Sequence, residues 1–345
     1  MKQILFFIIL ILAASDGFAQ TAIAQINSDS DVISFIRQQN YSKDAPQWNH
    51  FYLTDGTEWN NYFNLNAQQN SLAGGFSNLK SWQKTDINND GKTDLVVSGY
   101  IARQPGDWTT AVFKVLVFLQ TNKKNNYDKI NLLTDDVDRF PAYFDMFTLN
   151  GKNFIRLFYS QNDNAQKASQ PFTTDTLQYN SFVKNFIGYC GSLYPEAVQK
   201  IDYYVKDATS DAYHRVTIEK KQDGKCFIAF STKDAGSKNI ESHTLKIRND
   251  YFQSLDSLVR QYTVEGNEIV IGNDDDTSTV SPVITTITYN DGSRKVIKDC
   301  GNTNNYTLLA IYQTMEDAMQ TAINKIENRN EFWGGLIGGV AGGLL

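Results

Sequence analysis

The chain has 345 residues and three cysteines, its formal net charge is −6, and 13% of its residues are aromatic. An acidic chain without basic clusters repels phosphate backbones, which argues against nucleic acid as a partner. An odd cysteine count leaves at least one thiol unpaired within a monomer, and the sequence does not choose a disulfide among Cys190, Cys226 and Cys300.

The first nineteen residues have the features of a cleavable signal peptide. Lys2 gives a basic start, residues 4–14 form an apolar run, and Gly17 and Ala19 occupy the minus-three and minus-one positions of a cleavage site. The apolar run is shorter than the ~20 residues that a membrane-spanning helix needs. We therefore expect export to the periplasm or the extracellular space, with cleavage after Ala19; an uncleaved membrane anchor is the alternative.

Residues 20–190 are expected to form a strand-rich, antiparallel domain. A short amphipathic helix capped by Ser30 is predicted at residues 30–39. Runs of β-branched and aromatic residues then predict strands. These runs cover residues 95–101, 111–120, 143–150 and 153–160. The pair Asn150 and Gly151 predicts a hairpin between the last two strands, because a type I′ turn needs positive φ at both central positions.

The most specific motif is a loop rich in Asp and Asn at residues 86–94. Calcium binds roughly six to eight oxygens, and alternating oxygen-bearing side chains on a tight loop can turn several of them inward. The side chains of Asp86, Asn88, Asp90 and Asp94 and the carbonyl of Lys92 are the predicted ligands. We predict a structural Ca²⁺ site; a hairpin that binds no ion tightly is the alternative.

The residues that follow this loop distinguish it from an EF-hand. The twelfth loop position is Val97, inside an apolar run, where an EF-hand carries a bidentate Glu. A calcium loop whose ninth residue, Asp94, leads directly into a strand resembles the loop of the FG-GAP and VCBS repeats, over residues 82–100. The resemblance implies calcium binding. Those families build β-propellers from many copies, and this sequence contains no second copy of the loop.

A break in the pattern at residues 188–195 predicts a domain boundary, followed by an α+β domain over residues 196–327. A strand is expected at residues 201–205, and hairpins at residues 214–219 with 226–230 and 283–289 with 295–298. Apolar side chains at three- and four-residue steps predict helices at residues 252–262 and 308–326. The predicted fold class is therefore α+β, with these helices on one face of an antiparallel sheet.

Residues 196–327 also resemble a domain of unknown function found in exported proteins of Gram-negative bacteria. The resemblance is carried by residues 250–258, 274–276 and 284–301. Members of that domain often have paired cysteines between their first two strands, where residues 207–213 of this chain contain none. The resemblance implies export and no established activity. The acidic run Asp274 to Asp276 is a candidate second cation site, with a solvated loop as the alternative.

Residues 328–345 form a glycine-rich apolar tail. Its Gly-Gly pairs recur every four residues, a glycine zipper that as a helix would present a smooth groove to another helix. As a helix, residues 332–345 rise only about 21 Å, which is short of the ~30 Å hydrocarbon core. Peripheral membrane association or self-association through residues 332–345 is one hypothesis; a flexible tail, favoured by the backbone entropy of glycine, is the other.

The sequence shows no cluster of nucleophile, base and catalytic metal ligands. His50, His214 and His243 are the only histidines, and none lies four residues from another. Cys190 lacks the flanking residues of a papain-like nucleophile. The sequence favours a non-enzymatic envelope or secreted protein that binds an unknown protein or glycan. The alternatives are a periplasmic hydrolase with dispersed carboxylates and a membrane-active protein that uses the tail.

Overall fold

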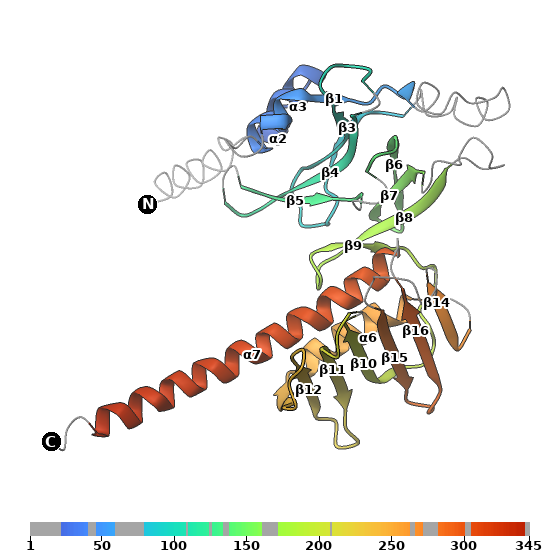
Figure 1. Ribbon diagram of the computed structural model, residues 1–345. Helices are drawn as coiled ribbons and strands as arrows, with labels where there is room; N and C mark the ends of the chain where they lie inside the picture. Colours follow the sequence, from blue (N-terminus) through green and yellow to red (C-terminus); the bar gives the residue numbers. More distant parts are fainter. Residues whose placement is uncertain are drawn as a thin grey trace, which may run out of the picture. The chain divides into compact units, whose positions relative to one another are not determined.

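The chain divides into two compact units, Met1–Ser181 and Phe182–Leu345, each with its own hydrophobic core. The computed structural model (Figure 1) describes residues 22–40, 46–58, 79–107, 110–123, 126–133, 138–160, 172–207, 209–262, 266–271, 282–300 and 305–341. Side chains of the last helix are described as far as Ile326. The predicted signal peptide and the acidic run that begins at Asp274 lie outside these residues.

The first unit contains a five-stranded antiparallel sheet whose centre is formed by β3 and β4. Its strands are β1 Phe51–Leu53, β2 Trp82–Thr85, β3 Asp94–Ile101, β4 Val112–Gln120 and β5 Tyr127–Asn131. β1 and β2 pair with successive halves of β3, and β4 pairs with the other edge of β3. The strands predicted at residues 95–101 and 111–120 are thus confirmed.

Helix α3, Asp29–Asn40, packs its apolar side chains on this sheet, after the short helix α2, Ala22–Gln25. Val32, Phe35 and Ile36 are buried with the β4 residues Leu116 and Phe118. The helix begins one residue before the predicted position. Its cap is therefore Ser28 and not Ser30: Asp31 N donates to the Ser28 hydroxyl, and Ser28 N donates to the Asp31 carboxylate. This reciprocal pair is a capping box, which is selected by the acid three residues after the cap.

A second antiparallel group of strands in the first unit follows sequence order. It comprises β6 Ala142–Leu149, β7 Lys152–Tyr159 and β8 Thr173–Asn180. Asn150 and Gly151 join β6 to β7 with φ of 51° and 74°. The predicted hairpin and its left-handed turn are therefore confirmed.

The second unit contains a seven-stranded sheet in the order β13-β12-β11-β10-β15-β16-β14. Its strands are β10 Val198–Lys206, β11 Tyr213–Lys220, β12 Cys226–Lys233, β13 Glu241–Ile247, β14 Glu268–Ile271, β15 Val283–Tyr289 and β16 Arg294–Asp299. The predicted strand and both predicted hairpins are confirmed. The parallel pairing of β14 with β16 is the exception to the antiparallel order. The edge strands β13 and β14 were not predicted, because their residues alternate between exposed and only half-buried positions.

Helices α6, Asn249–Arg260, and α7, Tyr306–Ala341, share one hydrophobic core with this sheet (Figure 1). Leu255 and Leu258 of α6 and Ile311 and Met315 of α7 are fully buried there. Ile187 of β9, Asn185–Gly188, belongs to the same core, so the second unit begins before the pattern break at residues 188–195.

α7 continues to Ala341 instead of ending at Ile326, so part of the glycine-rich tail is helical. Extending a formed helix adds a hydrogen bond per residue without repeating the cost of nucleation, which offsets the entropy lost by glycine. None of the helices in the described part of the chain is both long and apolar enough to cross a membrane.

Candidate calcium loop

The predicted calcium loop connects β2 to β3 across a tight turn. Thr85 at the end of β2 is directly opposite Asp94 at the start of β3. Two residues of the loop have a left-handed backbone, Asn89 with φ 58° and Gly91 with φ 84°. Asn and Gly tolerate this region better than other residues, so the loop can close without straining its neighbours.

The side chains of Asp86 and Asn88 converge on a single backbone amide. Asp90 N lies 3.0 Å from Asp86 Oδ1 and 3.1 Å from Asn88 Oδ1. Gly91 N donates to the other Asp86 oxygen at 2.8 Å. Each of these oxygens accepts one N–H and keeps a second lone pair. The loop therefore gathers oxygens from two side chains at one point.

The Asp90 carboxylate forms an ion pair with Lys92, two residues later in the loop. Lys92 N donates to Asp90 Oδ1 at 3.0 Å, and the Lys92 ammonium pairs with Asp90 Oδ2 at 3.1 Å. Both side chains are about a third exposed. A solvated pair of this kind contributes little to stability, so an incoming divalent cation could displace the ammonium at small cost.

Asp94 is buried and occupies a different environment. Its Oδ2 accepts from Ile87 N and its Oδ1 from Gln120 N, each at 2.9 Å. Burial raises the pKa of Asp94 to about 6, and the two amide hydrogen bonds oppose this shift only in part. In this conformation Asp94 ties the loop to the end of β4.

Asn153 of β7 is a loop partner that the sequence did not indicate. Its side-chain amide donates to the backbone oxygen of Asp86 at 2.6 Å and to Thr85 Oγ1 at 3.3 Å. Its own oxygen accepts from Thr148 Oγ1 at 2.7 Å, which holds the amide in place. The sequence separation of 67 residues carries no local signal for this contact.

The candidate ligands that the structure brings together are thus the side-chain oxygens of Asp86 and Asn88, whereas the Asp90 carboxylate bonds Lys92. Within the described ranges, no group of three or more His, Cys, Asp or Glu side chains is placed to hold a metal ion, so the carboxylates of Asp86, Asp90 and Asp94 do not form such a group. A mixed set of carboxylate, amide and carbonyl oxygens completed by water suits calcium better than zinc or other metals that prefer nitrogen and sulfur.

No protein-family model, curated protein or solved structure matches the chain. The resemblances of residues 82–100 and 196–327 therefore rest on the residues quoted for them.

The other chemically reactive residues lie on separate elements. His50 ends the short helix η1, Pro46–His50, whereas His214 bonds Glu316 and His243 lies against Phe230. Cys190, Cys226 and Cys300 are reduced, and the last two are buried.

Proposed function

We propose that this chain is an exported, non-enzymatic protein of the cell envelope or its surroundings, with a calcium ion stabilising its first unit at residues 86–94. The observation that carries the proposal is the convergence of Asp86 Oδ1 and Asn88 Oδ1 on the amide of Asp90. Such convergence places hard oxygen ligands together before any ion arrives.

The proposed role of the ion is structural. The loop is bonded to β4 through Asp94 and Gln120, and to β7 through Asn153. An ion that held the loop would therefore restrain β4 and β7 as well as β2 and β3, which the loop joins. With a dissociation constant of about 10⁻⁴ M, typical of extracellular modules, millimolar calcium would stabilise the fold by about 1.4 kcal/mol.

The finer architecture is part of the same proposal. The first unit, which ends at Ser181, is a β-rich domain, and the second is an α+β domain with its helices on one face of the sheet. The common core of α6, α7 and alternating residues of β10 to β12 supports this arrangement. Such a protein would bind a protein or glycan partner outside the cytoplasm.

Thermal unfolding of residues 20–345 with and without millimolar calcium tests the proposal. Asp90→Ala should abolish a calcium-dependent rise in Tm. Asp223→Ala is the matched control, because Asp223 makes the same contacts to Lys225 that Asp90 makes to Lys92. It should keep the full rise. A wild-type Tm that calcium does not change would contradict the proposal.

A further inference from the structure

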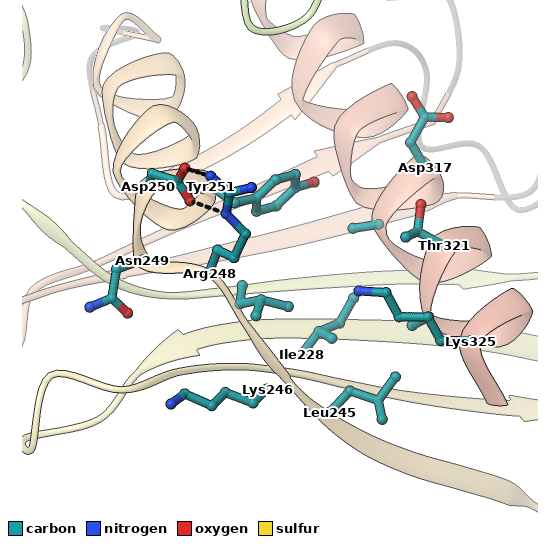
Figure 2. Close-up of a pocket in the computed structure, with 13 residues that line it drawn as sticks. Ile228, Leu245, Lys246, Arg248, Asn249, Asp250, Tyr251, Asp317, Thr321 and Lys325 are labelled. Atoms are coloured by element: carbon teal, nitrogen blue, oxygen red, sulfur yellow. Dashed lines mark hydrogen bonds and ion pairs between the residues drawn. The ribbon is translucent and has the colours of Figure 1, made fainter. Parts of the chain in front are cut away.

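The second unit contains a cleft of about 690 Å³, formed where the start of α6 and the strands β12 and β13 meet α7 (Figure 2). A volume of this size is within the usual range for small-molecule sites. Every residue that lines it belongs to the second unit, whereas the calcium loop is in the first.

The floor of the cleft is apolar. Ile228 of β12 and Leu245 of β13 are directly opposite each other in the strand pairing, and Ala318 and Ala322 face the cleft from α7. The small alanine side chains leave room between the helix and the strands. The Tyr251 hydroxyl at the side of the cleft is already engaged, since it donates to the Thr314 carbonyl at 3.3 Å.

The rim of the cleft carries one ammonium that reaches over the apolar floor, that of Lys325. Its acids have partners: Asp250 accepts two hydrogen bonds from Arg248, and Asp317 accepts one from Gln313 at 2.8 Å. Lys325 also lines the cleft and makes no ion pair or hydrogen bond with the described residues. Lys246 lies between the core-packed residues Leu245 and Ile247 of β13, so its side chain projects from the opposite face of the sheet. Figure 2 shows Lys325 reaching from α7 over the cleft, opposite the Arg248 and Asp250 pair.

This local charge is opposite in sign to the charge of the whole chain, which is −6. In an acidic protein, an apolar floor beneath a lysine without a partner is complementary to a ligand that is apolar at one end and anionic at the other. A cationic or uniformly polar ligand would leave either Lys325 or the floor unmatched.

We infer that this cleft binds a small amphipathic anion, with its apolar body on Ile228, Leu245 and Ala322 and its acidic head at Lys325. The inference does not depend on calcium binding by the first unit. The long, flexible stem of Lys325 lets its ammonium follow head groups of different length, so binding should weaken as salt is added.

Isothermal titration of the mature protein with dodecanoate below its micelle concentration tests the inference, with dodecyltrimethylammonium as the cationic match. We expect saturable binding of one dodecanoate and at least about tenfold weaker binding of the cation. Equal binding of the two probes, or no saturable binding, would overturn the inference.

Two variants locate the site. Lys325→Glu should raise the dodecanoate Kd by about tenfold or more, whereas Lys238→Glu, an exposed lysine outside the cleft, should change it by less than about twofold. Thr321→Trp, at an exposed lining position, should block binding sterically. Circular dichroism and an unchanged Tm would verify that each variant is folded.

The same variants also show when the inference fails. Equal Kd values for Lys325→Glu and Lys238→Glu would contradict it. So would a result in which dodecanoate does not bind and Thr321→Trp abolishes self-association in sedimentation, since a second copy of the chain would then occupy the cleft.

Discussion

Asp94 in the first unit and Asp202 in the second are both largely buried carboxylates on strands, but their surroundings differ. Asp94 accepts two backbone amides and is paired with no Lys or Arg side chain among the described residues, and burial raises its pKa to about 6. Burial alone would also raise the pKa of Asp202. There the hydrogen bonds and charge of Arg215, with Lys200 nearby, outweigh burial and lower the pKa.

This comparison shows that hydrogen bonds from backbone amides alone do not fully stabilise the ionised form of a buried carboxyl. A neighbouring cation stabilises that form, because its charge offsets the free-energy cost of removing the carboxylate from water. The second unit meets this need with an arginine from the adjacent strand β11. The first unit leaves Asp94 uncompensated beside the loop proposed to bind calcium.

The largest effect is expected from Asp94→Ala at pH 5 in a chelator, where the Asp94 carboxyl is mostly neutral and no buried charge is removed. The variant leaves the amides of Ile87 and Gln120 without their acceptors, which should destabilise the protein by about 3 kcal/mol in urea unfolding. Asp202→Ala frees Arg215, whose side chain is 51% exposed, and should cost only about 1 kcal/mol. Equal losses would show that the two carboxylates are equivalent.

The pH dependence of stability should have opposite signs at the two sites. The folded-state pKa of Asp94 is above its ordinary value of 3.8, so the native state binds the proton more tightly. Its contribution should therefore fall by roughly 2 to 3 kcal/mol as pH rises from about 4 to above 6. The folded-state pKa of Asp202 is lowered, so its contribution to the stability of the protein should instead be lost as pH falls below 3.8. Urea unfolding of the wild type and Asp94→Asn in a chelator at pH 4.5 and 7 would measure the first slope, which the variant should remove.

Glycine variants in two similar turns distinguish the effect of the calcium loop's backbone from the effect of its ligands. Gly91 has φ +84° and Gly224 has φ +78°, and an added Cβ would meet no atom within 4 Å at either position. Alanine at either site should cost about 1 kcal/mol, because only the left-handed backbone is penalised. In thermal melts, Gly91→Ala alone should also reduce the calcium-dependent shift. A reduction in Gly224→Ala would assign the shift to general stability.

The smallest effect is expected at Glu316 of α7, whose carboxylate is bonded to His214 and Tyr203. The hydrogen bond from His214 lowers the pKa of Glu316, so its contribution is present above pH 4.5 and is lost as pH falls through the lowered value. Because the pair is about a third exposed, Glu316→Gln should cost no more than about 0.5 kcal/mol at pH 6 by urea unfolding. A loss as large as that of Asp94→Ala would contradict this ranking.

Local chemistry explains which elements could be predicted. The Asn150-Gly151 turn was predicted because its left-handed backbone requires those residue types, and the two hairpins predicted in the second unit also turn at left-handed glycines, Gly224 and Gly292. The apolar stripes of α6 and of the first half of α7 also predicted those helices from the sequence. The edge strands β13 and β14 gave only a weak signal, because each contributes just two apolar side chains to the core, Leu245 and Ile247 in β13 and Ile269 and Ile271 in β14.

The sequence by itself determined the turns, the helical stripes and an oxygen-rich loop at residues 86–94, because each depends on neighbours in the chain. Tertiary structure alone decided which partners complete them. Gln120 and Asn153 reach the loop from β4 and β7, and the cleft beneath Lys325 exists only where α7 lies beside β12 and β13. Such contacts depend on strand order and helix placement, which sum many weak packing terms over distant residues and have no short-range signature in the sequence.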